Sequence, residues 1–180
     1  TATASNTGGY AGTETATATL KTSDDDTAGI TIAQASTPLV TTEAGTTASF
    51  TVVLDAKPTD NVTVSITGND STEHQLSSSS LTFTTSNWNT AQTVTVTGVD
   101  DSLDDGDITT TLTATASNTG GYAGTETATT TVKNTDNDTA GITIAKTGNT
   151  DGSGNLLTTE AGSSSTFTVA LDAQPTSNVT

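Results

Sequence analysis

The residues of this sequence best suited to chemistry are carboxylates, and they are clustered along the chain. Asp and Glu number 20 among 180 residues, whereas Lys and Arg number four, and there is one His and no Cys. The densest runs are DDD at 24–26, DDSLDDGD at 100–107 and DND at 136–138. Clustered carboxylates suit Ca²⁺, a hard cation that prefers oxygen ligands. Zinc, copper and iron–sulfur centres are poorly served by a chain without Cys and with a single His.

The same composition argues against several other kinds of function. Triad-type catalysis needs a His or Lys base beside a nucleophile and a third, orienting group, and His74, next to Glu73, has no evident partners of this kind. We therefore predict that the chain is not an enzyme and that His74 is an exposed loop residue. The net charge of −16 would repel nucleic acids and anionic membranes, so neither is expected as a partner. No signal-peptide pattern is present, and no apolar run approaches the ~18 residues that insert into a bilayer.

The chain repeats itself, and this decides the expected architecture. Residues 1–33 match residues 113–145 at 28 of 33 positions. After an insertion near Lys146–Asn155, the match resumes between Val40–Thr63 and Leu157–Thr180. A period above about 100 residues is too long for a solenoid coil and typical of a sandwich domain. We expect three regions: the C-terminal strands of a preceding repeat at 1–26, a complete repeat at 27–138, and the N-terminal strands of a following repeat at 139–180.

Within the complete repeat, apolar residues alternate with Thr at the period of a β-strand. Thr occupies 49 positions and favours strands because its branched Cβ is stiff. Trp88 is expected to cover one end of the core, and Tyr122 to pack over the turn before the last strand. The pattern predicts an all-β fold, a seven-stranded antiparallel Ig-like β-sandwich without helices. The expected strands centre on 30–32, 50–54, 62–66, 81–83, 94–96, 108–116 and 128–132.

Strand direction predicts where the carboxylates meet. If successive strands alternate in direction, the first, third, fifth and seventh end at the same pole of the sandwich. Acidic residues follow all four of these strands, whereas the opposite pole receives only scattered acids. Two carboxylates about 4 Å apart repel by about 1 kcal/mol in water and several times that near a protein surface, so this pole needs a counter-ion. The acids expected there are Glu43, Asp70, Asp100, Asp101, Asp104, Asp105, Asp107, Asp136 and Asp138.

A plainer alternative is that these acids are solvated loop residues that confer solubility. It explains a single acidic pair well, but it explains less well four separated segments that the topology brings together. The run DDSLDDGD is not an EF-hand loop, because it lacks the twelve-residue spacing and the terminal Glu. We therefore favour a divalent-cation site.

The segment Ser79–Asp107, together with DNDTAGI at 136–142 and TTEAG at 41–45, resembles the Calx-beta domain, especially its bacterial surface-protein members. The resemblance covers the complete repeat and both flanking regions, and it implies a seven-stranded sandwich with Ca²⁺ at one pole. The sequence departs from the family after the third strand, where GNDSTEH leaves Asp70 or Glu73 as a substitute ligand. The ligands implied by the resemblance are Glu43, Asp100, Asp101, Asp104, Asp107, Asp136 and Asp138, with Asp24, Asp25 and Asp26 serving the preceding repeat and Glu160 the following one.

Two functions fit these predictions. In the first, the chain is a calcium-stabilised stalk or spacer of an extracellular bacterial adhesin, surface layer or filament. Its partners would be neighbouring repeats of the same chain and, in a fibre, further copies associated laterally or end to end. In the second, it is a calcium sensor whose interdomain angle changes when the ion binds. Near-identical copies favour the spacer, because a sensor needs distinct sites.

Overall fold

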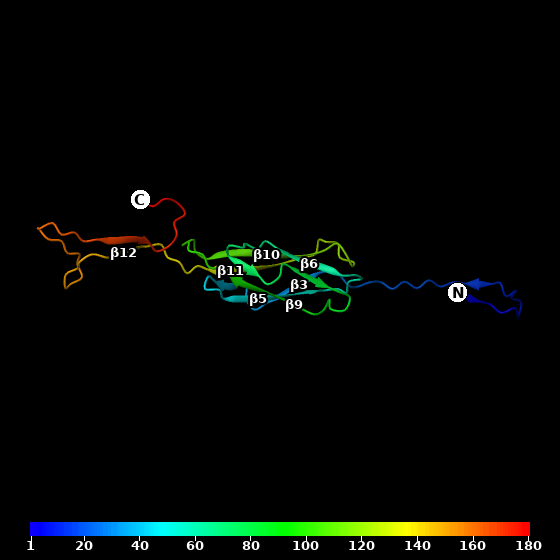
Figure 1. The fold of residues 1–180 in the computed structure, drawn as a ribbon. Helices are drawn as coiled ribbons and strands as arrows, with labels where there is room; N and C mark the ends of the chain where they lie inside the picture. Colours follow the sequence, from blue (N-terminus) through cyan, green and yellow to red (C-terminus); the bar gives the residue numbers. More distant parts are fainter.

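The structure, a computed structural model that describes residues 1–180, is a chain of β-strands without helices, and it has a central sandwich with a short segment at each end (Figure 1). No helix able to cross a membrane is present. The N-terminal segment contains β1 (Ala2–Thr3) and β2 (Thr15–Ala16), and the C-terminal segment contains β12 (Ile142–Lys146) and β13 (Phe167–Leu171). The sandwich contains β3 (Ile30–Gln34), β4 (Leu39–Thr42), β5 (Thr47–Leu54), β6 (Val62–Thr67), β7 (His74–Leu76), β8 (Ser80–Phe83), β9 (Gln92–Gly98), β10 (Ile108–Ala116) and β11 (Thr127–Thr135).

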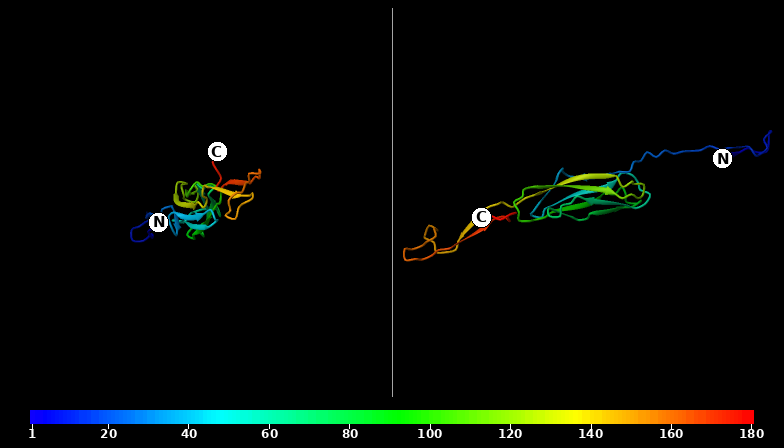
Figure 2. Two further views of the ribbon diagram at one scale, coloured as in Figure 1. Left: turned by 90° about the vertical axis from the view of Figure 1, so that its left-hand side faces the viewer. Right: turned by 90° about the horizontal axis from the view of Figure 1, so that it is seen from above.

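Two sheets face each other in the central sandwich (Figures 1 and 2). One has five strands in the order β4-β11-β10-β6-β8, and the other has four in the order β3-β5-β9-β7. All neighbouring strands are antiparallel except β4 and β11, which run parallel. The fold is thus the predicted all-β, Ig-like sandwich.

The sandwich forms because alternate residues of its strands point inward, and most of these residues are apolar. In β5, Phe50, Val52 and Leu54 are buried, while the residues between them are more exposed. In β9, Val94 and Val96 are buried in the same way. Burying a side chain of this size contributes about 1.5–3 kcal/mol, and 17 residues form the core. The intervening positions, many of them Thr, face outward.

Two strands add to the seven expected. The first predicted strand is two strands: β3 pairs with β5, and the chain then crosses to the other sheet, where β4 pairs with β11. The segment after β6 contains the three-residue β7, which pairs with β9. The prediction that His74 is an exposed loop residue is wrong, because His74 begins β7 and is only 1% exposed.

The pole opposite the carboxylates is closed by aromatic side chains. Tyr122 is buried, and its hydroxyl donates to the carbonyl oxygen of Ala56 (2.9 Å) and accepts from the Ala56 N–H (3.3 Å). Trp88 is half-buried and packs against the core. Its carbonyl oxygen accepts a hydrogen bond from the N–H of Leu54, the last residue of β5 (3.2 Å). Both aromatic residues therefore lie close to the expected positions.

The two terminal segments extend from opposite ends of the sandwich (Figures 1 and 2). Strands β12 and β13 pair Ile142 with Leu171, and this is the register in which β3 and β5 pair Ile30 with Leu54. Strands β1 and β2 likewise repeat a portion of the register of β10 and β11. The apolar side chains of β12 and β13 are exposed, Ile142 by 62%, because the segment lacks the strands that would cover them.

Candidate metal centre

Four strands of the sandwich end at the same pole: β4, β6, β9 and β11. Strand β4 is parallel to β11, and β6 and β11 are both antiparallel to β10, which begins at this pole. Gly98, the last residue of β9, lies against the carbonyl oxygen of Thr42, the last residue of β4. The loops that follow these strands carry most of the acidic residues of the sandwich. The largest of them connects β9 to β10, and we call Val99–Asp107 the acidic loop.

A first carboxylate group consists of Glu43, Asp136 and Asp138, which each place one oxygen within 4.8 Å of the others. Glu43 directly follows β4 and is only 3% exposed. Its Oε2 accepts a hydrogen bond from the Asn137 N–H (2.9 Å). The Oδ2 atom of Asp138 is buried and has no hydrogen-bond partner. A buried carboxylate oxygen without a donor costs free energy unless a ligand satisfies it.

Backbone N–H groups hold Asp136 of the first group in place. The N–H of Asp138 donates to Asp136 Oδ1 (2.7 Å), and the N–H of Gly106 in the acidic loop donates to Asp136 Oδ2 (2.8 Å). These bonds fix Asp136 between the acidic loop and the chain that leaves the sandwich.

The electrostatics of the first group show an excess of negative charge. Burial raises the pKa of Glu43 above its ordinary value, and the carboxylates of Asp136, Asp101 and Asp138 raise it further, against the opposing effect of the Asn137 N–H. Desolvation also raises the pKa of Asp138, and neighbouring carboxylates add to the shift, Asp136 most strongly. The one ion pair of the chain, between Lys133 and Asp107, involves none of the three members of the group. A divalent cation would supply the missing positive charge.

A second carboxylate group consists of Glu73, Asp101 and Asp105, whose nearest oxygens also lie within 4.8 Å of one another. Glu73 immediately precedes β7 and is 6% exposed, whereas Asp105 is exposed on the acidic loop. Burial raises the pKa of Glu73, and the charges of Asp105 and Asp101 add to the shift. Asp101 Oδ1 also accepts the N–H of Leu103 (2.7 Å), and this bond turns the acidic loop back on itself.

Asn134 connects the second group to the strands. Its side chain is 1% exposed on β11, and its Nδ2 donates to Glu73 Oε2 (3.3 Å) and to the carbonyl oxygen of Val99 (3.0 Å). Its Oδ1 accepts from the Thr41 hydroxyl (3.0 Å) on β4. Only a glycine fits at position 98, because a Cβ there would collide with the carbonyl oxygen of Thr42 and lie 2.6 Å from Asn134 Oδ1. Asn134 thus joins β4, β11 and the start of the acidic loop.

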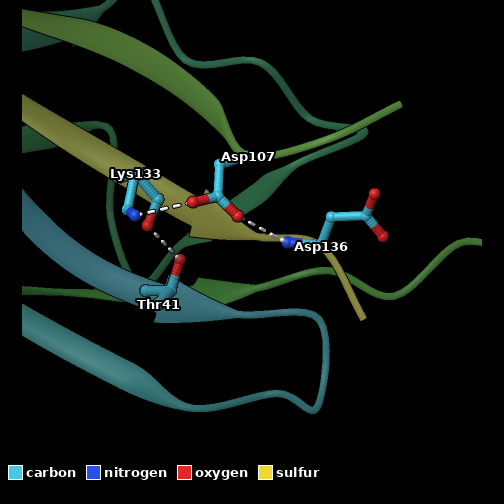
Figure 3. Close-up of polar contacts among 4 residues, drawn as sticks. All are labelled: Thr41, Asp107, Lys133 and Asp136. Atoms are coloured by element: carbon cyan, nitrogen blue, oxygen red, sulfur yellow. Dashed lines mark hydrogen bonds and ion pairs between the residues drawn. The ribbon is translucent and has the colours of Figure 1, made fainter. Parts of the chain in front are cut away.

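Asp107 lies outside both groups, between Lys133 and Asp136 (Figure 3). Its Oδ2 accepts from Lys133 Nζ (2.7 Å) and its Oδ1 from the Asp136 N–H (3.2 Å). The hydrogen bond from Lys133 is the largest cause of its lowered pKa. Thr41, drawn below Lys133 in the same view, donates to the carbonyl oxygen of Lys133 (3.3 Å). Asp107 therefore fixes the end of the acidic loop to β11.

The other predicted ligands lie outside the two groups. Asp100 accepts the side-chain amide of Asn137 (3.2 Å), and Asp104 accepts the Ala140 N–H (2.7 Å). The carboxylate of Asp70 accepts the N–H and hydroxyl of Thr72, which lower its pKa. Asp24 and Asp26 lie in the exposed link before the sandwich, where the Asp26 N–H donates to Asp24 Oδ1 (3.2 Å).

Four predicted ligands belong to the two carboxylate groups: Glu43, Asp101, Asp136 and Asp138. The other two members, Asp105 and Glu73, both belong to the second group and are not among the predicted ligands. The sequence predicts Asp105 at this pole but not as a ligand, and it predicts Glu73 only as one of two substitute ligands. No pattern in the sequence favours Glu73, because β7, the strand that it precedes, is only three residues long.

No family model matches the chain, and no curated protein matches it in sequence. Among solved structures, the apo form of the Calx CBD1 domain aligns at 16% identity and a TM-score of 0.42, over 61% of this chain and 99% of that domain. Domains 1–6 of the surface layer protein SbsC align at 19% identity and a TM-score of 0.42, over 86% of this chain and 22% of that one. A variant of the SrpA adhesin from Streptococcus sanguinis aligns at 18% identity and a TM-score of 0.39, over 62% and 60%. Likenesses at this level concern the β-sandwich fold alone, and the closer relationship to the Calx-beta family stays a prediction.

Proposed function

We propose that the central sandwich is one unit of a tandem-repeat stalk or spacer in an extracellular bacterial surface protein, and that Ca²⁺ stabilises each junction between units. The observation that carries the proposal is the first carboxylate group. Three carboxylates converge at the point where the chain leaves the sandwich, and the buried Oδ2 of Asp138 has no partner.

The donor set fits Ca²⁺ better than other common ions. All six members of the two carboxylate groups offer oxygen, and Ca²⁺ accepts mono- or bidentate carboxylates in flexible geometries. Mg²⁺ demands a more regular octahedron and gives up its water reluctantly. In the proposed site, Glu43, Asp136 and Asp138 hold one ion, and Glu73, Asp101 and Asp105 offer a second. The ion neutralises charges that otherwise repel one another.

The position of the first group suits a stalk. Asp136 and Asp138 belong to the segment that leaves β11, and only Thr139–Gly141 separate Asp138 from β12. A link this short is no flexible tether, so an ion held at its start restrains the angle at which the next unit continues. The sandwich also receives and releases its chain at opposite poles (Figure 1), as units of an extended row must. The close similarity of the copies supports a spacer, for which sameness is enough.

Calcium titration tests the proposal. We expect calorimetry on the chain to show Ca²⁺ uptake and thermal unfolding to show a higher Tm in excess Ca²⁺, by about 2.7 kcal/mol of added stability at a hundredfold excess over Kd. Glu43→Gln should weaken binding, whereas Asp60→Asn, a control at the far pole, should not. If Ca²⁺ neither binds nor changes the Tm, the acids are solvated loop residues and the proposal fails.

The affinity separates the two functions considered for the chain. A Kd of about 10⁻⁴–10⁻³ M is typical of extracellular modules and supports the spacer, whereas about 10⁻⁷–10⁻⁵ M is typical of sensors. Small-angle scattering of a chain with several repeats should show a longer maximum dimension in Ca²⁺ than in chelator. A sensor-range affinity, together with a large change of angle on binding, would favour the calcium sensor instead.

A further inference from the structure

We infer that the acidic loop is a docking element, and that its partner is the base of the following repeat in the same chain. The base is the portion of the C-terminal segment formed by Ala140–Ile142 and the turn Ala173–Pro175. The inference rests on the tandem arrangement proposed above, but it requires no metal ion.

Two hydrogen bonds join the loop to the base. The carbonyl oxygen of Ser102 accepts the N–H of Gln174 (2.6 Å), and Asp104 Oδ2 accepts the N–H of Ala140 (2.7 Å). Ala140 and Gln174 belong to the two separate segments of the chain that form the base, so the loop binds both segments at once. Between Ser102 and Asp104, Leu103 forms one wall of a cavity of about 490 Å³ that also includes Pro175 and Ala140.

The base of the central sandwich offers the same two donors without a partner. By the repeat alignment, Ala28 matches Ala140 and Lys57 matches Gln174. The N–H groups of Ala28 and Lys57 donate no hydrogen bond in the structure, and Lys57 is exposed. Residues 1–27 match 113–139, which follow the acidic loop, so residues 1–27 contain no counterpart of that loop. The donors used where a loop is present are therefore those left free where it is missing.

The apolar portion of the contact is smaller than the cavity. Ile142 and Leu171 line the cavity, but their counterparts Ile30 and Leu54 are buried by the other strands of the complete sandwich. In a complete following repeat these walls belong to its own core. In a complete following repeat, Leu103 can therefore contact only the edge of the cavity, around Ala140 and Pro175. This small apolar contact accompanies the two hydrogen bonds.

The loop can serve this purpose because successive residues face different ways. Asp101 and Asp105 face Glu73 within the sandwich, while Ser102, Leu103 and Asp104 contact the next repeat. The loop is in turn tied to β11 through Asp107 and Lys133. An ordered loop thus connects the core of one unit to the base of the next.

Amide exchange in a chain with two complete copies tests the inference. In the engineered chain, residues 1–138 are followed directly by a second copy of residues 27–138. Thr27 of the second copy therefore takes the place of Thr139. We expect the Lys57 amide of the second copy, which meets the loop of the first, to exchange about tenfold more slowly than the Lys57 amide of the first copy. The two amides have the same sequence surroundings, so each is the control for the other.

Substitutions locate the contact. Leu103→Asp in the first copy should remove this protection, and the same change in the second copy, which no repeat follows, should leave it intact. Asp104→Ala in the first copy should speed exchange at Ala28 of the second copy about fivefold. Equal exchange of the two Lys57 amides, or protection that survives Leu103→Asp and Asp104→Ala together, would overturn the inference.

Exchange is measured in both Ca²⁺ and chelator, because the two proposals then fail separately. Protection in chelator, without Ca²⁺ uptake, would leave the docking contact standing and remove the metal. Ca²⁺ uptake, with equal exchange rates for the two Lys57 amides, would leave the metal site standing and remove the docking contact.

Discussion

The carboxylate of Glu43 accepts a 2.9 Å hydrogen bond from the backbone N–H of Asn137, which lies 94 residues later in the chain. Glu43 follows β4 and Asn137 follows β11, the parallel neighbour of β4. The contact fixes an early strand to the segment that leaves the sandwich, where Asp136 and Asp138 each place one oxygen within 4.8 Å of the Glu43 carboxylate. The buried glutamate therefore sets the geometry of the first carboxylate group.

Glu43→Gln should stabilise the metal-free protein at neutral pH, and less so in acid. Because the folded-state pKa of Glu43 is raised, the folded state binds more protons than the unfolded state, and its stability falls as pH rises through this pKa. Gln keeps an oxygen for the Asn137 N–H and carries no charge. Chemical unfolding in chelator at pH 7 and at about pH 5 measures the difference between variant and wild type. A gain that is equal at both pH values would contradict the raised pKa.

His74→Leu should remove an acid sensitivity of the sandwich. Both ring nitrogens of His74 are buried without partners, and burial lowers its pKa, although Asp70 opposes the shift. The folded state therefore binds fewer protons, and wild-type stability is lost as pH falls below the ordinary His value of about 6.5. Unfolding of wild type and variant between about pH 7.5 and pH 5 should show the wild type losing stability relative to His74→Leu. Parallel curves would show that His74 is not neutral and buried.

Asn134→Leu should cost far more stability than removing the neighbouring salt bridge. The substitution leaves Glu73 and the Val99 carbonyl without the Asn134 donor, at a cost of about 1–3 kcal/mol for each buried group left unpaired. The Thr41 hydroxyl loses its bond to Asn134 and keeps only the longer one to the Lys133 carbonyl. Lys133→Ala removes a partly exposed ion pair and should cost less than about 1 kcal/mol. Denaturant unfolding compares the two variants, and similar losses would show that the Asn134 network contributes little.

Tyr122→Phe should destabilise the sandwich by about 1 kcal/mol, because the buried hydroxyl bonds both the N–H and the carbonyl of Ala56. Tyr10 holds the equivalent position in the N-terminal segment, where it is 57% exposed. Tyr10→Phe is therefore the matched control and should leave the Tm unchanged. The comparison fails if both substitutions have the same effect.

The sandwich itself could be predicted from the sequence because alternation is a local property. Each run of alternating apolar residues, such as Phe50–Leu54, became a strand with those residues inward. Local pattern could not show that Ile30–Gln34 and Leu39–Thr42 belong to different sheets, because a crossing between sheets leaves the alternation intact. His74 was misplaced for a related reason, since three residues are too few for an alternating pattern.

Strand direction predicted the acidic pole but not the two carboxylate groups. The grouping depends on the conformation of the acidic loop. Hydrogen bonds from backbone N–H groups, such as that from Leu103 to the Asp101 carboxylate, determine this conformation. It also depends on Lys133, which draws Asp107 toward β11. Which carboxylates face one another is thus a property of loop conformation that residue types alone do not contain.

The parallel pairing of β4 with β11 has a mechanical consequence. The chain enters the sandwich at one pole and leaves it from the end of β11 at the other (Figure 1). A pull on the two ends therefore drags these neighbours along their length in opposite directions. The four residue pairs from Leu39–Val132 to Thr42–Thr135 carry this load together, in shear. In a peeling geometry, by contrast, the pairs would separate one after another. A row of such units should resist tension by sharing it across whole strands.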